Sequence, residues 1–416
     1  MKVTFCTYDT PTFVGGSNSW LCRLLPELVR RGIEVRVLFF INASSPDECS
    51  TYCTLRDQGI KCSTYPCRYT YTEDRALWIL NQLVKEPPDV FVPNMLVSAF
   101  YAARWVKEAE IPTVGLLHAD DPFHYAVLSE FVFGQPAYQF SAVACVSQFL
   151  EQEVIKQAHN STTLIRRLPC GAPVPLHVAQ PPTTQLKLAY VGRLIEEQKR
   201  ISDVTQALCR VVQEVPDTQV VIYGDGDARH SVAQIIEENN CEPLVRLGGR
   251  VDSAHIQQAM LECHVLVLLS DYEGLPVAVM EAMACGVVPI CLRVRSGILE
   301  LVEDGVTGLL VSDRGDDFVA AVRRLRYEPQ LWEKLSASAR AKIEAEYSNE
   351  VCAANWEAFL RELHQGARQR RTIKIPNRFN LPPVHPDFEQ GDYRPLHASP
   401  ILLLRRLQLL AGIKVS

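Results

Sequence analysis

The chain has 416 residues, of which 47% are hydrophobic and 22% are charged, a composition typical of a globular rather than a disordered protein. This length exceeds what one ordinary hydrophobic core accommodates, so two domains are expected. The formal net charge of −6 argues against a general nucleic-acid binder. Residues 365–416 are nevertheless basic, with nine Lys or Arg residues against three acidic ones. Such a tail suits an anionic lipid or an acidic partner, or is simply solvated.

The fourteen cysteines do not indicate a disulfide framework. The chain begins Met1-Lys2-Val3 with no charged-then-apolar leader, many cysteines lie inside apolar runs, and no Cys pair has zinc spacing. No uninterrupted apolar run approaches the length of a membrane span. We therefore expect a reduced, cytoplasmic protein.

Short apolar runs alternate with amphipathic segments in the first half of the chain. Helices are expected between the runs, for example at residues 20–31 and 98–108. Continuous apolar strands separated by helices indicate a parallel sheet covered on both faces. The expected strands are residues 3–7, 35–40, 90–92, 113–117 and 142–146.

A Pro-rich stretch from residue 169 to residue 184 interrupts this alternation and is interpreted as an interdomain linker. The alternation then resumes, which predicts an α/β fold with two doubly wound, parallel-sheet domains of Rossmann type facing each other across a cleft. The predicted domains are residues 1–176 and 177–348. The expected strands of the second domain are residues 186–191, 219–223, 245–247, 265–269, 288–292 and 308–311.

Residues 349–416 form a third region, with an amphipathic helix expected at 351–363 and a Pro-rich stretch after it. The last segment, residues 401–415, is apolar and basic. A helix this apolar must cover its surface, and the first domain, a second subunit or an anionic membrane could provide the cover. We expect docking on protein, because Arg406 interrupts the apolar face and Gly412 weakens a free helix.

Two glutamates provide the strongest functional signal. Glu273 lies in the loop after the strand at 265–269, and Glu281 lies in the helix that follows Pro276. Helical side chains lean toward the helix N-terminus, so both carboxylates are expected to converge there. They could accept hydrogen bonds from sugar and ribose hydroxyls, while the N–H groups of Gly274 and Leu275 could bind phosphate or sugar oxygens. The alternative is an acidic loop before a capped helix.

Two further candidate sites lie at strand ends: one contains a pair of cations and the other a pair of glycines. Arg193 follows the strand at 186–191, and Lys199 is expected to open the next helix. Both cations could neutralise a diphosphate, although surface cations are usually only solvated. Gly15-Gly16 follows the first strand and would allow close approach of backbone to a phosphate, or form a plain tight turn.

His118 closes the strand at 113–117 and is a candidate for the reacting centre, or a histidine that merely ends a strand. Two acidic pairs, Asp120-Asp121 and Asp225 with Asp227, raise the question of a metal. Neither pair has the His or carboxylate set of a divalent site nearby, so no metal and no cofactor are predicted.

Together these residues resemble the retaining glycosyltransferases of family 4, which have the GT-B fold. The resemblance covers most of residues 1–350, and its most specific part is Glu273-Gly274-Leu275-Pro276 followed by Glu281-Ala282-Met283-Ala284-Cys285-Gly286. It implies that Glu281 binds ribose hydroxyls, Glu273 the sugar, Arg193 and Lys199 the diphosphate, and His118 the transferred sugar. Gly15-Gly16 matches the glycine loop of the family.

The chain departs from the family pattern at three places. Lys199-Arg200 stands where the family often has Lys-Gly, and Cys170-Gly171 stands for Asn-Gly. The Gly-Gly-x-x-Glu loop is Ser296-Gly297-Ile298-Leu299-Glu300 in this chain, which affects the expected phosphate geometry.

The resemblance implies a metal-independent, retaining hexosyltransferase with a nucleotide-sugar donor as co-substrate and an unidentified acceptor. No nucleic-acid partner is expected, and residues 400–416 could contact a membrane or a subunit. The alternatives are a nucleotide-sugar epimerase or a sugar phosphorylase on the same fold, and a non-catalytic protein that binds a sugar or a partner.

Overall fold

The computed structural model describes residues 1–11, 16–66, 71–158, 162–252, 255–367, 369, 371–382 and 385–388. Gly15 and the apolar segment at 401–415, both singled out above, lie outside the described residues. The chain divides into two compact units. The first contains residues 1–146 and 150–168, together with the chain from Ala353 on, and the second contains residues 147–149 and 169–352.

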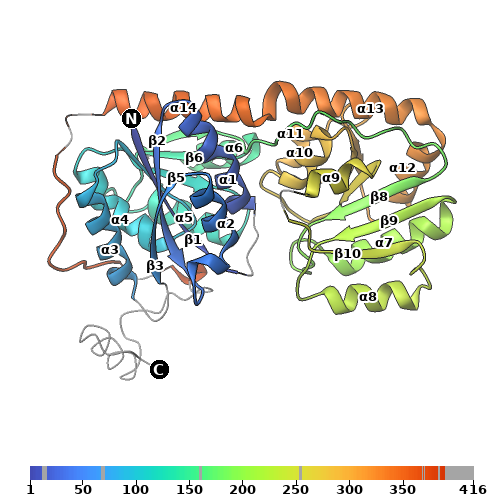
Figure 1. Cartoon of the computed structure of the whole chain (residues 1–416), viewed down its shortest axis with the longest axis horizontal. Helices are drawn as coiled ribbons and strands as arrows, with labels where there is room; N and C mark the ends of the chain where they lie inside the picture. Colours follow the sequence, from blue (N-terminus) through green and yellow to red (C-terminus); the bar gives the residue numbers. More distant parts are fainter. Residues whose placement is uncertain are drawn as a thin grey trace. The chain divides into compact units, whose positions relative to one another are not determined.

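The first unit is built on parallel strands with helices between them (Figure 1). Strands β3-β2-β1-β4 form one sheet and β5-β6-β7 another, and a parallel bridge between Phe91 and Thr113 joins β4 to the start of β5. The strands are β1 (Lys2–Asp9), β2 (Glu34–Ile41), β3 (Lys61–Pro66), β4 (Val90–Pro93), β5 (Val114–Leu117), β6 (Ala142–Cys145) and β7 (Leu164–Arg167). The helices are α1 (Gly16–Arg30), α2 (Ser50–Asp57), α3 (Thr72–Lys85), α4 (Val97–Glu108), α5 (Pro122–Phe131) and α6 (Gln148–Gln157).

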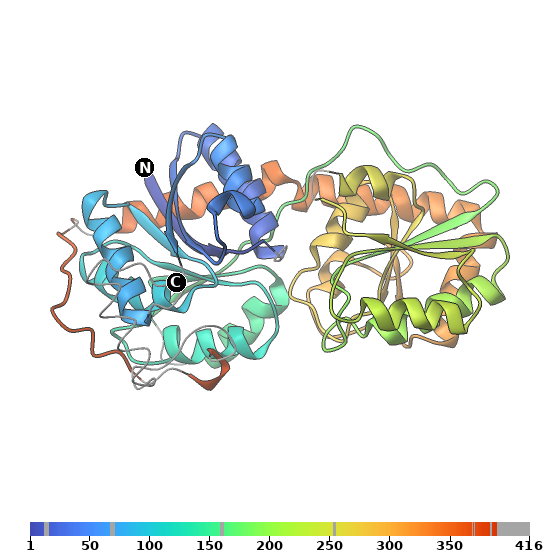
Figure 2. The same cartoon turned by 60° about the horizontal axis from the view of Figure 1, so that its bottom comes forward.

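The second unit has one parallel sheet with the strand order β10-β9-β8-β11-β12-β13. In Figure 2 this sheet lies between two layers of helices. The strands are β8 (Leu186–Val191), β9 (Thr218–Tyr223), β10 (Val245–Gly249), β11 (Val265–Leu268), β12 (Val288–Leu292) and β13 (Leu309–Val311). The helices are α7 (Ile201–Glu214), α8 (Arg229–Glu238), α9 (Ile256–Leu261), α10 (Val277–Ala284), α11 (Ile298–Leu301), α12 (Asp316–Tyr327) and α13 (Pro329–Lys342).

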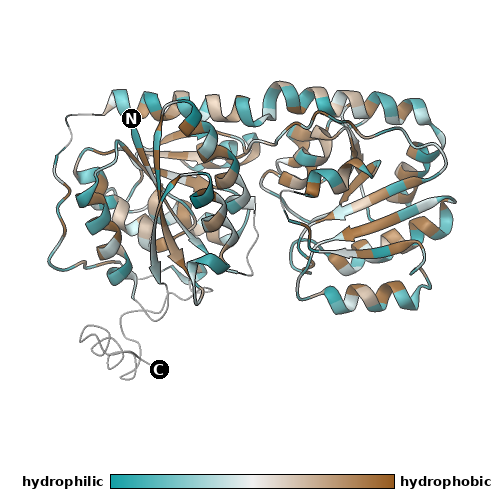
Figure 3. Ribbon diagram, viewed as in Figure 1, coloured by the Kyte–Doolittle hydropathy of each residue, from teal (hydrophilic) through white to brown (hydrophobic). Residues whose placement is uncertain are grey.

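The central strands form the core of each unit because both of their faces are covered. Every residue of β4, β5, β6, β11 and β12 is buried, as the continuous apolar runs predict. Figure 3 shows the same division, with hydrophobic strands inside and hydrophilic residues on the outer faces of the helices. The predicted α/β fold of two doubly wound parallel sheets is therefore confirmed.

Helix α14 (Asn349–Gly366) begins among residues of the second unit and belongs to the first unit from Ala353 on. Its Trp356 is buried against Trp20 of α1, with the two ring centroids 5.3 Å apart. Among the described residues beyond α14, the N–H of Arg371 donates to the carbonyl of Ala109 in the first unit over 2.9 Å.

Cysteines of the described residues are free thiols, and most of them are buried. Burial raises the pKa of the Cys22 thiol to about 12 and that of Cys285 to about 12. Buried thiols of this kind pack as small apolar side chains.

Candidate functional site

The loop after β8 is held in place by an unusually close approach of the loop after β9. A Cβ on Gly224 would lie 1.9 Å from the carbonyl oxygen of Gly192, and one on Gly226 would lie 2.5 Å from that of Leu194. Both glycines also have positive φ, 146° and 157°, which disfavours any other residue. The N–H of Leu194 donates to the carbonyl of Asp225 over 3.0 Å. The stretch Gly224–Asp227 thus fixes the backbone that carries Arg193.

Lys199 contacts the loop that contains Glu273 directly, and Arg193 is linked to the same loop through Gln198. The ammonium of Lys199 contacts the Glu273 carboxylate, and their side chains are 12% and 8% exposed. A guanidinium N–H of Arg193 donates to the amide oxygen of Gln198 over 3.1 Å. The Gln198 amide nitrogen lies 2.9 Å from the carbonyl oxygen of Tyr272 and 3.4 Å from Glu273 Oε2. Two cations, an amide and a carboxylate therefore meet at the carboxyl ends of β8 and β11.

Helix α7 begins at Ile201, so the prediction that Lys199 opens this helix is wrong by two residues. Arg200 precedes the helix in the left-handed conformation, with φ 51° and ψ 43°. This backbone turn ends the loop. A glycine adopts such a conformation without steric cost, so Arg200 is the less favourable residue at this position.

The second glutamate lies on the first turns of α10, after Pro276 as the N-cap residue. Glu281 and Glu273 are each 6% exposed, and Leu275 is equally buried. Gly274 packs against Gly297, because a Cβ on Gly297 would lie 1.9 Å from the Gly274 carbonyl oxygen. The loops before α10 and α11 therefore support each other, and the convergence of the two carboxylates stays a prediction.

The departure at Ser296 is accommodated locally. Its hydroxyl accepts a hydrogen bond from the N–H of Ile298 over 3.2 Å, which satisfies a free donor at the start of α11. The backbone of Gln148 donates to Glu300 Oε2 over 2.8 Å. The serine thus replaces a glycine without displacing Gly297, where a side chain has no room.

In the first unit, His118 follows β5 and lies among polar and aromatic partners. Its Nε2 is 2.8 Å from Oδ1 of the fully buried Asn94, and its ring centroid is 5.3 Å from that of Trp20. The neighbouring His124 is buried, and its Nδ1 lies 2.7 Å from Asp121 Oδ1. Desolvation, assisted by His124 and opposed by Asp121, lowers the pKa of His118 to about 3, so the ring is neutral at physiological pH.

Of the remaining predicted residues, Asp120, Asp121 and Asp225 have hydrogen-bond partners. Gly16 is the first residue of α1 and is exposed. Asp121 is the N-cap of α5, the carboxylate of Asp120 accepts from the hydroxyl of Tyr125, and Asp225 Oδ1 accepts from the N–H of Gly226. In the part of the chain that the structure describes, no three His, Cys, Asp or Glu residues are grouped to hold a metal ion. Among the same residues, no helix is long and apolar enough to cross a membrane.

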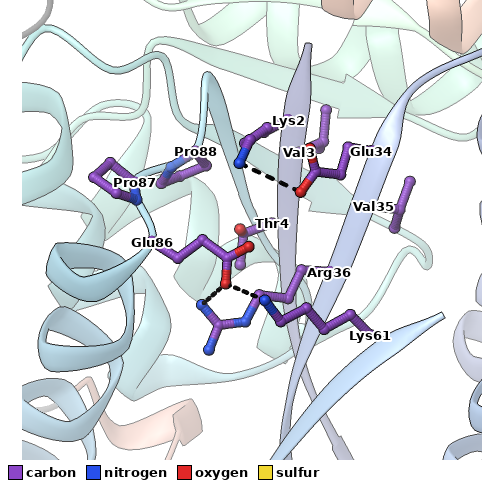
Figure 4. Close-up of a pocket in the computed structure, with 10 residues that line it drawn as sticks. All are labelled: Lys2, Val3, Thr4, Glu34, Val35, Arg36, Lys61, Glu86, Pro87 and Pro88. Carbon is purple, nitrogen blue, oxygen red and sulfur yellow. Dashed lines mark hydrogen bonds and ion pairs between the residues drawn. The ribbon is translucent and has the colours of Figure 1, made fainter.

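A small cavity of about 40 Å³ lies at the end of the first sheet where β1, β2 and β3 begin, opposite to their carboxyl ends (Figure 4). Its lining includes two ion-pair groups: Lys2 with Glu34 at 3.4 Å, and Glu86 with both Arg36 at 3.3 Å and Lys61 at 2.6 Å. The volume suffices for water but not for a nucleotide. We interpret it as a structural feature of the sheet edge.

Two residues of the candidate site could not be identified from the sequence. Gln198 and Asn94 carry no local signal, because a buried amide is recognised only from its partners in space. Gln198 adjoins Lys199 in the chain, and Asn94 follows the apolar strand β4, so each lies where a loop leaves a parallel sheet. The location at the end of a predicted strand was the only feature of the sequence that could have pointed to either residue.

Two parallel-sheet units joined in one chain are the scaffold of GT-B glycosyltransferases. The model of Glycosyltransferase Family 4 matches residues 14–174, and that of Glycosyl transferases group 1 matches residues 177–342. The chain belongs to glycosyltransferase family 4.

Individual relatives differ in how much of the chain they match. Alpha-D-kanosaminyltransferase of Streptomyces kanamyceticus is 29% identical over 42% of this chain. N-acetyl-alpha-D-glucosaminyl L-malate synthase of Bacillus anthracis is 32% identical over 38% of it. The matched stretches are 45% and 41% of the length of those relatives. A lipopolysaccharide core biosynthesis glycosyltransferase of Rhizobium meliloti is 24% identical over 89% of this chain and 100% of its own length.

Solved structures share the fold at low sequence identity. The Anabaena protein HepE, determined in complex with UDP and glucose, has a TM-score of 0.70 and 19% identity. The likeness covers 87% of this chain and 100% of HepE. TarM of S. aureus has a TM-score of 0.70 and 14% identity, over 86% and 99% of the two chains. These likenesses confirm the GT-B fold.

Proposed function

We propose that this chain is a retaining glycosyltransferase that transfers a sugar from a nucleoside diphosphate sugar to an acceptor hydroxyl or similar group without a metal ion. The observation that carries this proposal is the cluster of Arg193, Lys199, Gln198 and Glu273 at the strand ends of a family 4 scaffold. Cations beside a carboxylate suit a ligand that combines a diphosphate with sugar hydroxyls.

Each residue has a role in this proposal. Arg193 and Lys199 offset the charge of the diphosphate, which grows as the bond to the sugar breaks. Glu273 accepts hydrogen bonds from the sugar and Glu281 from the ribose. Backbone N–H groups of Gly274 and Leu275, and those of the Gly15-Gly16 loop, bind phosphate or sugar oxygens.

The reaction needs no protein nucleophile under this proposal. The anomeric carbon develops positive charge as the diphosphate leaves, and the acceptor attacks from the same face, which retains the anomeric configuration. A neutral His118 can exchange a hydrogen bond with the transferred sugar without adding positive charge beside the anomeric carbon.

The test is transfer activity in variants of the two glutamates. Glu273→Ala and Glu281→Ala should each abolish most transfer while the protein still folds, although Glu273→Ala should melt at a lower temperature because it leaves the Lys199 ammonium without its carboxylate. Glu242→Ala, an exposed acid in the same unit, is the matched control and should retain activity. Near-normal turnover in both site variants would refute the assignment. HepE was solved with UDP and glucose, so UDP-sugars are the first donors to screen, followed by GDP- and ADP-sugars.

Two further measurements separate the alternatives. Full transfer in excess chelator is expected, and a strict requirement for a divalent ion would show that Asp120-Asp121 or Asp225 with Asp227 bind a metal. Product analysis identifies the reaction class: an epimerised nucleotide sugar or a free sugar phosphate would replace the transfer proposal with an epimerase or a phosphorylase.

A further inference from the structure

The side chain of Gln198 connects the two loops that carry the proposed phosphate and sugar contacts. It is only 9% exposed. Its amide oxygen accepts from Arg193, while its amide nitrogen lies within hydrogen-bond distance of the Tyr272 carbonyl and of Glu273 Oε2. In addition, its backbone carbonyl accepts from the N–H of Asp271 over 3.0 Å. Gln198 therefore contacts the loop after β11 with both its backbone and its side chain.

The orientation of this amide is fixed by the chemistry of its partners. A guanidinium only donates hydrogen bonds and a carbonyl only accepts them. The end of the amide that faces Arg193 must therefore be the oxygen, and the end that faces Tyr272 must be the nitrogen. Rotating the amide by half a turn would place two donors together at one end and two acceptors at the other.

No other side chain of this size meets both requirements. A glutamate would accept from Arg193, but it could not donate to the Tyr272 carbonyl and would place a second negative charge beside Glu273. A methionine would fill the space and leave the buried carbonyl of Tyr272 without this donor. Lysine or arginine would face Arg193 with a like charge.

We propose that Gln198 is a positioning residue that orients Arg193 toward the diphosphate and keeps Glu273 directed at the sugar. The inference rests on the proposed function. Before the donor binds, Lys199 contacts Glu273 Oε1 and Gln198 lies beside Oε2. When Lys199 turns to the diphosphate, Gln198 keeps its contact with the carboxylate, so the sugar meets an acceptor already in place.

The experiment measures binding and transfer in Gln198→Met and Gln198→Glu. The ligand is the nucleoside diphosphate, among those of uridine, guanosine and adenosine, that the wild type binds most tightly, and the corresponding nucleoside is measured in parallel. Gln198→Met should weaken diphosphate binding about tenfold and leave nucleoside binding unchanged. Adding Gln198→Met to Arg193→Ala should cause little further loss, because the amide acts on the diphosphate through Arg193.

Gln198→Glu tests the other half of the inference and also covers a Gln198→Met protein that fails to fold. It keeps the acceptor for Arg193 and loses the donor on the Glu273 side. The turnover number should therefore fall more than the diphosphate affinity does. The control is Gln213→Met, because Gln213 is an exposed amide of the same unit whose nitrogen donates to the Asn239 carbonyl over 3.0 Å. It should match the wild type.

Three results would overturn the inference. The first is a Gln198→Met protein that loses equal affinity for the diphosphate and for the nucleoside. The second is a loss of diphosphate affinity in Gln198→Met that adds fully to that of Arg193→Ala, and the third is a Gln198→Glu protein that transfers sugar normally. Failure of the proposed function is a separate outcome: a wild type that binds diphosphate but transfers no sugar refutes the reaction, while the affinity data still decide the role of Gln198. A wild type that binds no diphosphate refutes both.

Discussion

Lys199 and Glu273 form an ion pair that is almost completely shielded from water, since their side chains are 12% and 8% exposed. Each charge would be costly to leave alone in such a place. A diphosphate that recruits Lys199 must therefore compete with the Glu273 carboxylate. Under the proposed function, Lys199 therefore stays paired with Glu273 until a ligand with more negative charge binds.

The competition predicts an unusual phenotype for Glu273→Gln. The amide keeps the size of the side chain and releases Lys199, so nucleoside diphosphate affinity should stay equal or rise a few-fold. Sugar transfer should fall by about a hundredfold, because an acceptor of sugar hydroxyls has lost its charge. Calorimetry of diphosphate binding and a transfer assay on the same protein would provide the two values.

Lys199→Met is the counterpart and should behave in the opposite way. It leaves the Glu273 carboxylate buried without its cation, so both the melting temperature and the diphosphate affinity should fall. If Glu273→Gln lost as much diphosphate affinity as Lys199→Met, the carboxylate would not be a competitor of the phosphate.

Arg200 provides a test of backbone strain beside the site. Its φ of 51° costs about 1 kcal/mol for a residue with a side chain. The Arg200 guanidinium lies 2.8 Å from Asp203 and 3.8 Å from Asp271. Both Arg200→Gly and Arg200→Ala remove these contacts, so the difference in stability between the two variants isolates the backbone contribution. The glycine variant should be the more stable by about 1 kcal/mol in thermal unfolding.

The control for Arg200 is the same pair of substitutions at Gln206, an exposed position inside α7. There the order should reverse, with alanine more stable than glycine by up to about 1 kcal/mol. If alanine were more stable than glycine at both positions, the left-handed conformation of Arg200 would cost no stability.

The central strands and the charged residues of the candidate site could be predicted from the sequence. The structure shows why the edge strands and the contacts within the site could not. Strands β3 and β7 were not predicted, because β3 is half-exposed along its length and β7 contains Arg166 and Arg167. Such edge strands lack the continuous apolar run that indicates a buried strand. The sequence identified the charged residues one at a time. It could not identify the Lys199–Glu273 ion pair or the roles of the Gln198 and Asn94 amides, because these depend on which loops meet in the folded chain.

The neutral His118 ring predicts a contribution to the pH dependence of stability. Its folded pKa of about 3 lies below the usual value near 6.5. Between these two values the unfolded chain binds more protons than the folded one, so the free energy of unfolding falls as the pH is lowered. Melting temperatures from pH 7 to pH 4 should therefore fall more steeply for the wild type than for His118→Gln. Parallel curves would mean that His118 titrates normally in the folded chain.

The ion pairs of Glu86 at the far edge of the first sheet should stabilise the fold without serving the reaction (Figure 4). Glu86→Gln leaves the Arg36 side chain, which is 8% exposed, without its carboxylate. The expected loss is about 1 kcal/mol, because Glu86 itself keeps some contact with water.

The same pairs lower the pKa of Glu86, with the Lys61 hydrogen bond as the largest cause. Its stabilising contribution is therefore present above the usual pKa of a glutamate and disappears as the pH falls through the lowered value. Wild type and Glu86→Gln should differ in melting temperature at pH 7 and converge in acid. Diphosphate affinity should be equal in both, and a loss of affinity would contradict the structural interpretation of this cavity.

The last prediction concerns the chain beyond α14, where Phe388 in the short 3-10 turn Pro386–Phe388 is 2% exposed. Its ring centroid lies 5.4 Å from that of Phe123 and 6.2 Å from that of Phe131, both on α5. Earlier in the same stretch, Phe379 packs on Trp105 with centroids 5.0 Å apart. Aromatic contacts of Phe379 and Phe388 thus hold residues 371–382 and 385–388 on the first unit.

Phe388→Ala should lower the stability of the first unit by about 2 kcal/mol. This is less than for a phenylalanine in a central strand, because a segment near the chain end can detach without opening the sheet. Asp387→Ala, whose side chain is 42% exposed, is the control and should melt like the wild type. Calorimetric melting with and without nucleoside diphosphate separates the units: the ligand should raise the transition of the second unit, and Phe388→Ala should lower only that of the first. An unchanged first transition in Phe388→Ala would show that these aromatic contacts add no stability, whereas a parallel loss of diphosphate affinity would show that the segment also supports the donor site.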